Sequence, residues 1–490
     1  MTGAMVAVDL TGAIPNNVGL DSRPALVKTL ARFKTGYMKW WRECGPQGFD
    51  AAQCYLRLPV AADQRGWASY DYVKLEDFRW GVFQSERVPD KRALFGRPAG
   101  RPKLDAVPAE FRGTVIKLLT TQGDTEPASV EQITYLGRMA PSNYDLRNLF
   151  QINCEEGRHL WAMVHLLCEH FGKEGEREID GLLARRSGSA ENPRILNAFN
   201  HPIEEFLSFL FWSTLADRDG KYQLLSMSES AFDPLARTSK FMLFEEAHHM
   251  FVGDDGLRRV IQRTGELMVA HDTDDVAPQG GINLSTIQRY LNYWAPPVID
   301  LFGSEMSQWS EDLFDAGLKG RVYEAERYAE HVRLEDTIEI ERVAEGGVAE
   351  GGVAEGGVAN GGLVAAQVPM RKAINEVARE TYLREIDGVV DRWNRMLAKM
   401  EIKFAFRRPS KRFNRKIGAY KDFFFTPEGE RVSRETFEAG LRHWLPSDAE
   451  KAHVRALMQP VYAPGKIAGW IAPPARGIDG KPLEYEYVRL

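Results

Sequence analysis

Two near-identical pentads, Glu155–His159 and Glu245–His249, constrain this chain more than any other feature. Both read Glu-Glu-x-x-His, and both lie within long stretches of helical periodicity. A glutamate and a histidine three residues apart project from the same face of a helix, so both can bind one metal ion. A glutamate within an otherwise apolar helix face is unfavourable unless it is paired or bound to a metal. The pentads therefore predict a metal centre between two helices. Glu450 and His453 have the same spacing but no sister motif, and we interpret them as a chance pair.

The second pentad leaves the register of its ligands open, because Glu245 and His248 have the same spacing as Glu246 and His249. The match between the two pentads favours the later pair. The first glutamate of each pentad, Glu155 or Glu245, then becomes an acid that orients a metal ligand without binding the metal itself.

Two further carboxylates complete the predicted centre. A di-iron carboxylate centre in a four-helix bundle takes one additional carboxylate from each of two other helices. Counting 30 residues back from Glu156 gives Glu126, and counting 29 back from Glu246 gives Asp217. Four carboxylates and two neutral imidazoles balance the charge of two ferrous ions, and these donors suit iron. The predicted metal ligands are Glu126, Glu156, His159, Asp217, Glu246 and His249.

The local sequence around the two upstream acids predicts irregular settings for both. Pro127 directly follows Glu126, and a residue before proline is disfavoured in the α conformation, so we expect a kink at Glu126. Asp217 is followed closely by Gly220, which predicts that it lies near the end of a helix, with Asp219 as the alternative ligand.

Helical periodicity predicts a mainly α fold. Residues 23–41 form an amphipathic pattern, residues 108–342 read as successive helices, and residues 370–400 read as another helix. The aromatic-rich segment 54–101 reads as loops with a short strand pair. The domains that we expect are 1–105 (an N-terminal helix and loops), 106–342 (a di-iron helical bundle core), 343–365 (a glycine-rich insertion) and 366–490 (a helix and a basic, aromatic C-terminal region).

The glycine-rich insertion is a repeat of five residues. Val343–Gly347 reads Val-Ala-Glu-Gly-Gly, and the unit recurs up to Gly362. Each glycine disfavours helix by about 1 kcal/mol, and the repeat has little apolar surface to bury. We therefore expect a flexible surface insertion between helices; the alternative is a functional lid.

Composition excludes several classes of protein. The 490 residues carry a net charge of −6, so no general attraction to nucleic acid or to an anionic membrane is expected. The four cysteines form no Cys-x-x-Cys pair, which argues against a disulfide scaffold or a thiolate zinc site. The N-terminal residues do not resemble a signal peptide, and no stretch approaches the roughly 20 apolar residues of a membrane span. We expect a cytoplasmic protein.

The pentads and their upstream carboxylates resemble those of the soluble di-iron carboxylate proteins of ferritin-like fold. More narrowly, the chain is similar to the family of oxygenase components of benzoyl-coenzyme A (CoA) 2,3-epoxidases. That similarity rests on Phe244–His249, Gly45–Gly48 and Pro409–Phe413. It implies a ferritin-like four-helix bundle core that carries a di-iron site, with extra helices and irregular N- and C-terminal regions.

The resemblance also implies an activity and its partners. One oxygen atom of O2 is inserted across the 2,3 bond of the aromatic ring of benzoyl-CoA, and the other becomes water. Electrons come from NADPH through a separate flavin and iron–sulfur reductase. The chain shows neither a GxGxxG motif after a strand nor a ferredoxin-like cysteine spacing, which agrees with a separate reductase.

A basic, aromatic block at residues 403–416 is the candidate for binding the phosphates of CoA. Guanidinium and ammonium groups bind phosphate well. The same block fits docking of an acidic reductase or a solvated surface. The predicted substrate-binding residues in it are Arg407, Arg408, Lys411 and Arg412.

Phe209, Phe211 and Trp212, just upstream of Asp217, are candidates for the wall of a substrate pocket or for ordinary bundle core. Three other functions fit parts of the pattern. A ferritin-like ferroxidase is disfavoured by the long flanking regions. A radical-generating reductase subunit is disfavoured because Met163 stands where such proteins have a tyrosine. A di-iron oxygenase acting on another thioester, such as phenylacetyl-CoA, differs only in the acyl group.

Overall fold

The computed structural model describes residues 6–7, 14–44, 55–62, 68–74, 81–88, 91–96, 100–321, 336–344, 362–463 and 465–475. The fold is mainly α, as the periodicity predicts. The helices are α1 (Pro24–Cys44), α2 (Arg112–Gly123), α3 (Glu126–Gln132), α4 (Asn143–Phe171), α5 (Lys173–Ala184), α6 (Phe206–Ser228), α7 (Asp233–His271), α8 (Leu284–Ile299), α9 (Gln308–Asp315), α10 (Ile374–Lys399), α11 (Arg434–Trp444) and α12 (Asp448–Leu457).

The strands are few and short, and all the pairings between them are antiparallel. The strands are β1 (Val6–Ala7), β2 (Tyr55–Ala62), β3 (Ala68–Lys74), β4 (Arg92–Ala93), β5 (Arg101–Pro102), β6 (Thr337–Val343) and β7 (Leu363–Pro369). They form one three-stranded sheet, β1-β2-β3, and two two-stranded ribbons, β4-β5 and β6-β7. The pair β2-β3 confirms the strand pair predicted within residues 54–101.

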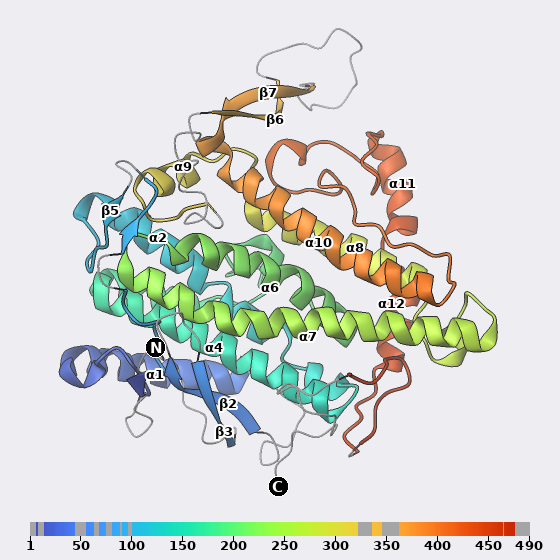
Figure 1. The fold of residues 1–490 in the computed structure, drawn as a ribbon, viewed down its shortest axis with the longest axis horizontal. Coiled ribbons are helices and arrows are strands. Elements are labelled where there is room, and N and C mark those ends of the chain that lie inside the picture. Colours follow the sequence, from blue (N-terminus) through green and yellow to red (C-terminus); the bar gives the residue numbers. More distant parts are fainter. Residues whose placement is uncertain are drawn as a thin grey trace.

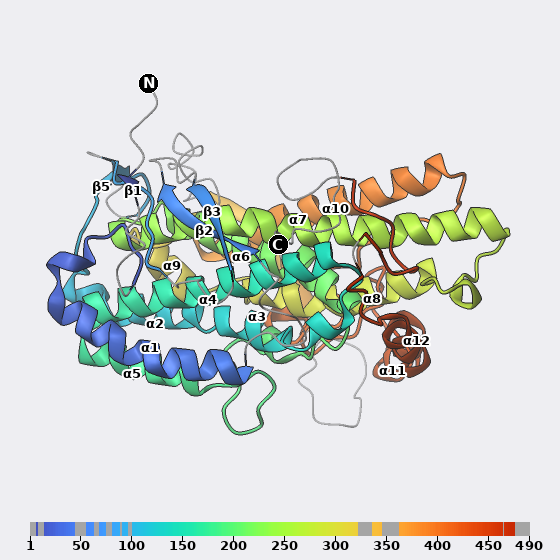
Figure 2. The same cartoon turned by 90° about the horizontal axis from the view of Figure 1, so that it is seen from below.

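Helices α3, α4, α6 and α7 form a bundle core of the ferritin-like type, which confirms the predicted fold class. Figures 1 and 2 show α4, α6 and α7 running side by side through the molecule, with α3 against α4. Helix α7 spans 39 residues, about 58 Å at 1.5 Å per residue, and is the longest described helix. Because α4 is buried around most of its circumference, it lies at the centre of the packing.

Two glycines of α7 allow α6 and α7 to pack closely. A Cβ at Gly253 would collide with the backbone of Thr214, and a Cβ at Gly256 would collide with the side chain of Leu210. Any larger residue at either position would push the helices apart. The sequence thereby brings the two helices together three residues from Asp217.

The helical conformation is interrupted between α2 and α3, where the sequence predicts a kink. Asp124 and Thr125 separate the two helices, Glu126 is the first residue of α3, and Pro127 occupies its first turn. The buried Asp124 carboxylate accepts a hydrogen bond from the Ile195 backbone N–H at 2.5 Å. This hydrogen bond holds the connection between α2 and α3 against the loop that follows α5.

The predicted helix end near Asp217 is wrong. Helix α6 continues through Asp217 and Gly220 to Ser228. Gly220 faces the carboxylate of Glu246 on α7, and a Cβ at this position would lie 3.7 Å from it. Tertiary packing of α6 against α7 outweighs the cost of about 1 kcal/mol for a glycine inside a helix. Asp217 therefore sits on a continuous helix.

The prediction that helices flank the glycine-rich insertion is also wrong. Residues 337–343 and 363–369 are strands of one ribbon, paired from Thr337↔Pro369 to Val343↔Leu363. The alternation Ile338-Glu339-Ile340-Glu341 is a strand signature within the segment expected to be helical. The glycine-rich repeat therefore connects two strands. Its residues 345–361 lie outside the described part of the chain.

The C-terminal region is held to the helical core by buried ion pairs. Arg379 of α10 pairs with Glu305 at 3.1 Å, and Arg415 lies in the same buried network, paired with Asp300. Across the described ranges, no helix has both the length and the hydropathy needed to cross a membrane.

Candidate metal centre

The two pentads face each other across α4 and α7. The Nδ1 atom of His159 lies 3.6 Å from a carboxylate oxygen of Glu156 and 3.6 Å from one of Glu246. The Nδ1 atom of His249 lies 3.5 Å from the second oxygen of each of these two glutamates. Glu156 and Glu246 therefore each lie between the two imidazoles, with one oxygen turned toward each ring.

The two upstream carboxylates complete this arrangement. Glu126 of α3 lies on the His159 side, with its Oε2 atom 3.4 Å from His159 Nδ1. Asp217 of α6 lies on the His249 side, in one group with Glu156 and His249 whose ligand atoms are all within 4.8 Å of one another. All six predicted ligands are between 0 and 6% exposed. The structure thus brings the predicted set together in one buried cluster.

The unpaired atoms of the cluster point to bound cations. His159 Nδ1, His249 Nδ1, Asp217 Oδ2 and Glu246 Oε2 are buried and make no hydrogen bond. Polar atoms left in this way cost about 1–3 kcal/mol each, and more when charged. Four carboxylates and two inward-facing imidazole nitrogens satisfy the donor requirements of two divalent ions. The donor set therefore fits two metal ions, one on each side of the Glu156–Glu246 pair.

An outer ring of polar groups fixes both imidazoles, and each pentad supports the histidine of the other. His159 Nε2 donates to Glu245 Oε2 at 2.8 Å, and His249 Nε2 donates to Glu155 Oε2 at 3.1 Å. Because a carboxylate only accepts, each ring carries its proton on Nε2 and leaves Nδ1 free to bind a metal.

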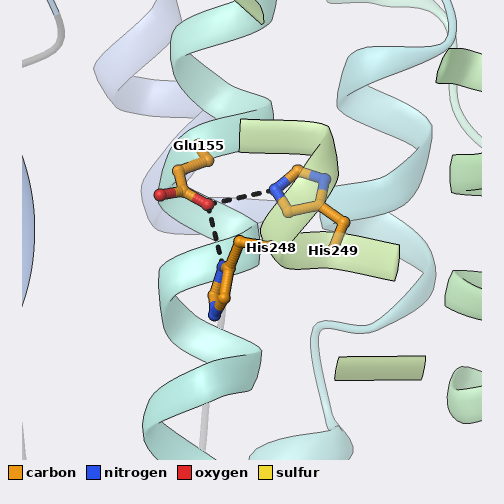
Figure 3. Close-up of side chains that lie close together, drawn as sticks. All are labelled: Glu155, His248 and His249. Carbon is orange, nitrogen blue, oxygen red and sulfur yellow. Dashed lines mark hydrogen bonds and ion pairs between the residues drawn. The ribbon is translucent and has the colours of Figure 1, made fainter. Parts of the chain in front are cut away.

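The fourth residue of each pentad also contacts the first glutamate of the other pentad. Arg158 forms a buried ion pair with Glu245. His248 Nδ1 donates to Glu155 Oε2 at 3.2 Å, so that Glu155 holds two histidines, as Figure 3 shows. The two sides of the centre therefore differ, since one outer carboxylate is paired with a permanent cation and the other with an imidazole.

This geometry bears on the register of the second pentad. His248 contacts Glu155 through Nδ1, and its Nε2 atom lies 3.3 Å from Asn148 Oδ1. Glu155, His248 and His249 form a further group of potential ligands, which shares His249 with the cluster. Only the pair Glu246 and His249 shares the cluster with the two upstream carboxylates.

Burial and crowding of charges shift the pKa values within the cluster. Burial raises the pKa of Glu156 well above its ordinary value, and the charges of Glu126, Glu246 and Asp217 add to the shift. Burial likewise raises the pKa of Asp217 to about 7. Burial alone would raise the pKa of Glu126, but its pKa is lowered because the neighbouring His159 and the amide of Gln122 favour the ionised carboxylate. Crowded carboxylates of this kind take up protons when no cation is bound.

The predicted basic block lines a cavity of about 820 Å³ between α8, α10 and the segment before α11. Arg407, Arg408 and Lys411 line it, and Arg289 of α8 adds a fourth cation. Arg412 does not line this cavity. The aromatic side chains of Phe404 and Trp444 contribute apolar walls.

Most cations of the block are already paired within the protein. Arg408 pairs with Asp387 at 2.6 Å, Lys411 with Glu376 at 2.6 Å, and Arg412 with Glu341 at 2.8 Å. Arg407 is exposed, and no described acid forms an ion pair with it. The block therefore offers less free positive charge than its composition suggests.

The aromatic residues predicted to wall a pocket are buried in the bundle core. Phe209, Phe211 and Trp212 are at most 2% exposed. Phe211 stacks on Tyr290 of α8 with ring centroids 6.4 Å apart, and Trp212 meets Trp294 edge-on at 5.7 Å. These contacts attach α8 to α6.

The pair Glu450 and His453 has a structural role far from the pentads. Glu450 closes the capping box of α12 with Ser447 and accepts a hydrogen bond from Thr286 at 2.7 Å. The imidazole of His453 lies 3.0 Å from the backbone oxygen of Gly281.

The sequence did not predict the roles of two supporting residues. Arg158 pairs with the outer carboxylate of Glu245, and Gln122 Nε2 donates to Glu126 Oε1 at 2.9 Å. The recurrence of a basic or imidazole residue at the fourth position of both pentads was a usable signal for Arg158. Gln122 carried none, because the break between α2 and α3 decides where it points.

Comparison with known proteins adds one relative. The chain is 44% identical over 486 residues to benzoyl-CoA oxygenase component B of Aromatoleum evansii, an alignment that covers 99% of this chain and all of the relative. No family model matches the chain.

In the metal-free protein, we expect the free energy of unfolding to fall as the pH rises. Between the ordinary pKa of 3.8 and about 7, folded Asp217 holds a proton that the unfolded chain has released. Its stabilising contribution is therefore complete below 3.8 and is lost as the pH rises through about 7. Glu156 acts in the same direction.

Melting temperatures of the metal-free protein across this pH range provide the measurement. The fall should be shallower in the Asp217→Asn variant, which cannot ionise at that position. Identical pH profiles for the parent and the variant would contradict the expectation.

Proposed function

The chain belongs to the family of benzoyl-CoA oxygenase component B, and on that premise we propose that it is the di-iron oxygenase component that epoxidises benzoyl-CoA. One oxygen atom of O2 enters the aromatic ring at the 2,3 bond to give 2,3-epoxybenzoyl-CoA, and the other is released as water. The relative's name includes the substrate and identifies it as one component of a larger system.

The observation that carries the proposal is the pair of inward-facing imidazoles. Both Nδ1 atoms are turned toward Glu156 and Glu246, while both Nε2 atoms are engaged by outer carboxylates. Mixed oxygen and imidazole ligands suit iron, and four carboxylates neutralise two ferrous ions. The proposed ligands are Glu126 and His159 on one side, Asp217 and His249 on the other, and Glu156 and Glu246 between them.

If bound by these residues, two iron ions would supply the electrons and coordination sites for the reduction of O2. The protein's own part is to hold geometry and to exclude water. Glu245 and Glu155 keep both imidazoles in the tautomer that presents Nδ1. The buried Arg158 pairs with Glu245 and holds it in place. Burial of the cluster and close packing of α6 on α7 would keep water out of the centre.

The cavity beside α8 and α10 is the proposed site for the phosphates of CoA. Its volume of about 820 Å³ is within the range of known ligand sites. Arg407 supplies free positive charge, and Arg289, Arg408 and Lys411 add cations whose partners lie in the same region.

The reaction also requires electrons, for which we propose a separate NADPH-dependent reductase carrying flavin and iron–sulfur groups.

We expect purified protein to bind two irons per chain. Glu156→Ala or Glu246→Ala should lose most of that iron together with the activity, because each carboxylate lies between both metal positions. His249→Ala should behave in the same way, whereas His248→Ala should keep its iron and part of its activity. Iron analysis and turnover of benzoyl-CoA with a reductase supplied provide the measurements.

His453→Ala is the matched control, because it removes the histidine of a Glu-x-x-His pair far from the centre. It should retain both irons. If His248→Ala loses the iron and His249→Ala keeps it, the ligand set is displaced by one residue. Full retention of iron by the Glu156→Ala, Glu246→Ala double variant would refute the site.

Replacement of Arg407 tests the CoA site. Arg407→Gln should raise KM for benzoyl-CoA roughly fivefold, as expected for about 1 kcal/mol from an exposed ionic contact, while kcat changes little. Added salt should reduce the difference. Arg412→Gln is the control, because Arg412 lies outside the cavity lining and pairs with Glu341. A lower apparent affinity for the reductase at unchanged KM would identify the block as a docking surface instead.

A further inference from the structure

A row of aromatic side chains leads from the surface to the metal-binding helix. Helix α1 carries Tyr37, Trp40 and Trp41, and α4 carries Trp161. Ring centroids are 6.2 Å apart between Trp41 and Trp40, 5.4 Å between Trp40 and Tyr37, and 5.6 Å between Tyr37 and Trp161. Neighbouring rings are thus close enough for electrons to pass between them.

Only the outer end of this row meets solvent. Trp161, Tyr37 and Trp40 are 1, 1 and 2% exposed, whereas Trp41 is partly exposed. The three buried rings are enclosed by the apolar cluster that joins α1 to α4. Water does not reach them, so a charge placed on one of them passes to the next ring more readily than it reacts.

The inner end of the row adjoins the metal centre. Trp161 follows His159 by two residues on α4, about 3 Å along the helix axis. Because two residues turn the helix by a little over half a revolution, His159 faces the bundle interior and Trp161 faces α1. Arg158, which directly precedes His159, pairs with Glu245 behind that histidine and also exerts its charge on Tyr37.

The polar surroundings of the two buried indoles differ. The Trp40 N–H donates to Oε1 of Glu131 at 2.8 Å, an oxygen that also accepts from Arg194 at 2.7 Å. Arg194 compensates the charge of the carboxylate, but the donated N–H itself still stabilises a positive charge on the indole ring. The Trp161 N–H has no hydrogen-bond partner among the described residues, and the cationic Arg158 acts on its neighbour in the row, Tyr37. A positive charge is therefore more stable on Trp40 than on Trp161. It moves outward.

We propose that four side chains, Trp161, Tyr37, Trp40 and Trp41, form an electron relay. This relay reduces the oxidised iron centre when no substrate is bound. The relay rests on the proposed function, because its oxidant is the centre after reaction with O2. Trp161 gives one electron to the centre and is left with a positive charge. This charge passes through the ring of Tyr37, which keeps its proton, to Trp40 and then to Trp41.

The electron balance closes with a soluble thiol as the outer reductant. Two thiols each give one electron to Trp41, lose one proton each and join as a disulfide. The two electrons pass inward singly. Together with the two electrons that the reduced centre would itself give to O2, and with four protons from solvent, they would convert O2 to two molecules of water. The expected benefit is protection, since an oxidant without substrate otherwise attacks the side chains around it.

The test lets reduced, iron-loaded protein react with O2 and a soluble thiol in the absence of any thioester. Three variants interrupt the relay: Trp161→Phe, Trp40→Phe and Trp41→Phe, of which the last removes a partly exposed ring and disturbs folding least. Trp470→Phe is the matched control, because Trp470 is 2% exposed and belongs to a different core cluster. Melting temperature and iron content establish that each variant is folded and loaded.

Two readouts besides activity decide the outcome. Rapid freezing and electron paramagnetic resonance should detect a tryptophan radical in the parent and in Trp470→Phe, with its pattern changed by deuterated tryptophan. The signal should be absent from Trp161→Phe. Peptide mass spectrometry should show a several-fold increase in oxidised side chains on α4, α6 and α7 in the relay variants, which should also survive several-fold fewer turnovers.

Equal radical yield and equal oxidation in Trp161→Phe, Trp41→Phe and the parent would overturn the relay and leave the proposed oxygenase function standing. A parent protein that is loaded with iron but consumes no O2 would overturn both. Loss of the radical in Trp470→Phe as well would also overturn the relay, because the signal would then belong to no particular route.

Discussion

Four carboxylates and two imidazoles buried in one place form the constraint on which the rest of the structure depends. Charges removed from water are unfavourable by several kcal/mol each unless opposite charge compensates them. Among the described residues, no lysine or arginine forms an ion pair with Glu126, Glu156, Asp217 or Glu246, and the cation Arg158 stands one layer outside, paired with Glu245. Protons or bound cations must therefore compensate the charge of the cluster.

The surroundings of the cluster follow from this requirement. The long helices α4, α6 and α7 and the short helix α3 each contribute a residue to the cluster, and glycines in α7 bring α6 close enough to contribute Asp217. The crossed support of the two pentads fixes both imidazole tautomers without a further element, since each helix supplies the outer carboxylate for its partner. The difference between Arg158 and His248 makes the surroundings of the two imidazoles chemically unequal.

The helices and the gathering of the six predicted residues in one buried cluster could be predicted from sequence, largely from local spacing. Glu156 and His159 share a face in any helix, and one recurring pentad marks the second half of the site. Features decided by distant contacts could not be predicted. Gly220 suggests a helix end until α7 packs over it, and the cations near Arg408 lose free charge to acids such as Asp387, far away in sequence.

Anomalous diffraction from crystals of the iron-loaded protein, recorded at the iron absorption edge, tests whether the cluster holds two iron ions. Two peaks separated by roughly 3.5–4 Å should appear, the usual spacing of two-metal sites. One peak should adjoin Glu126 and His159, and the other should adjoin Asp217 and His249. A single peak, or a peak held by Glu155 and His248, would contradict the account.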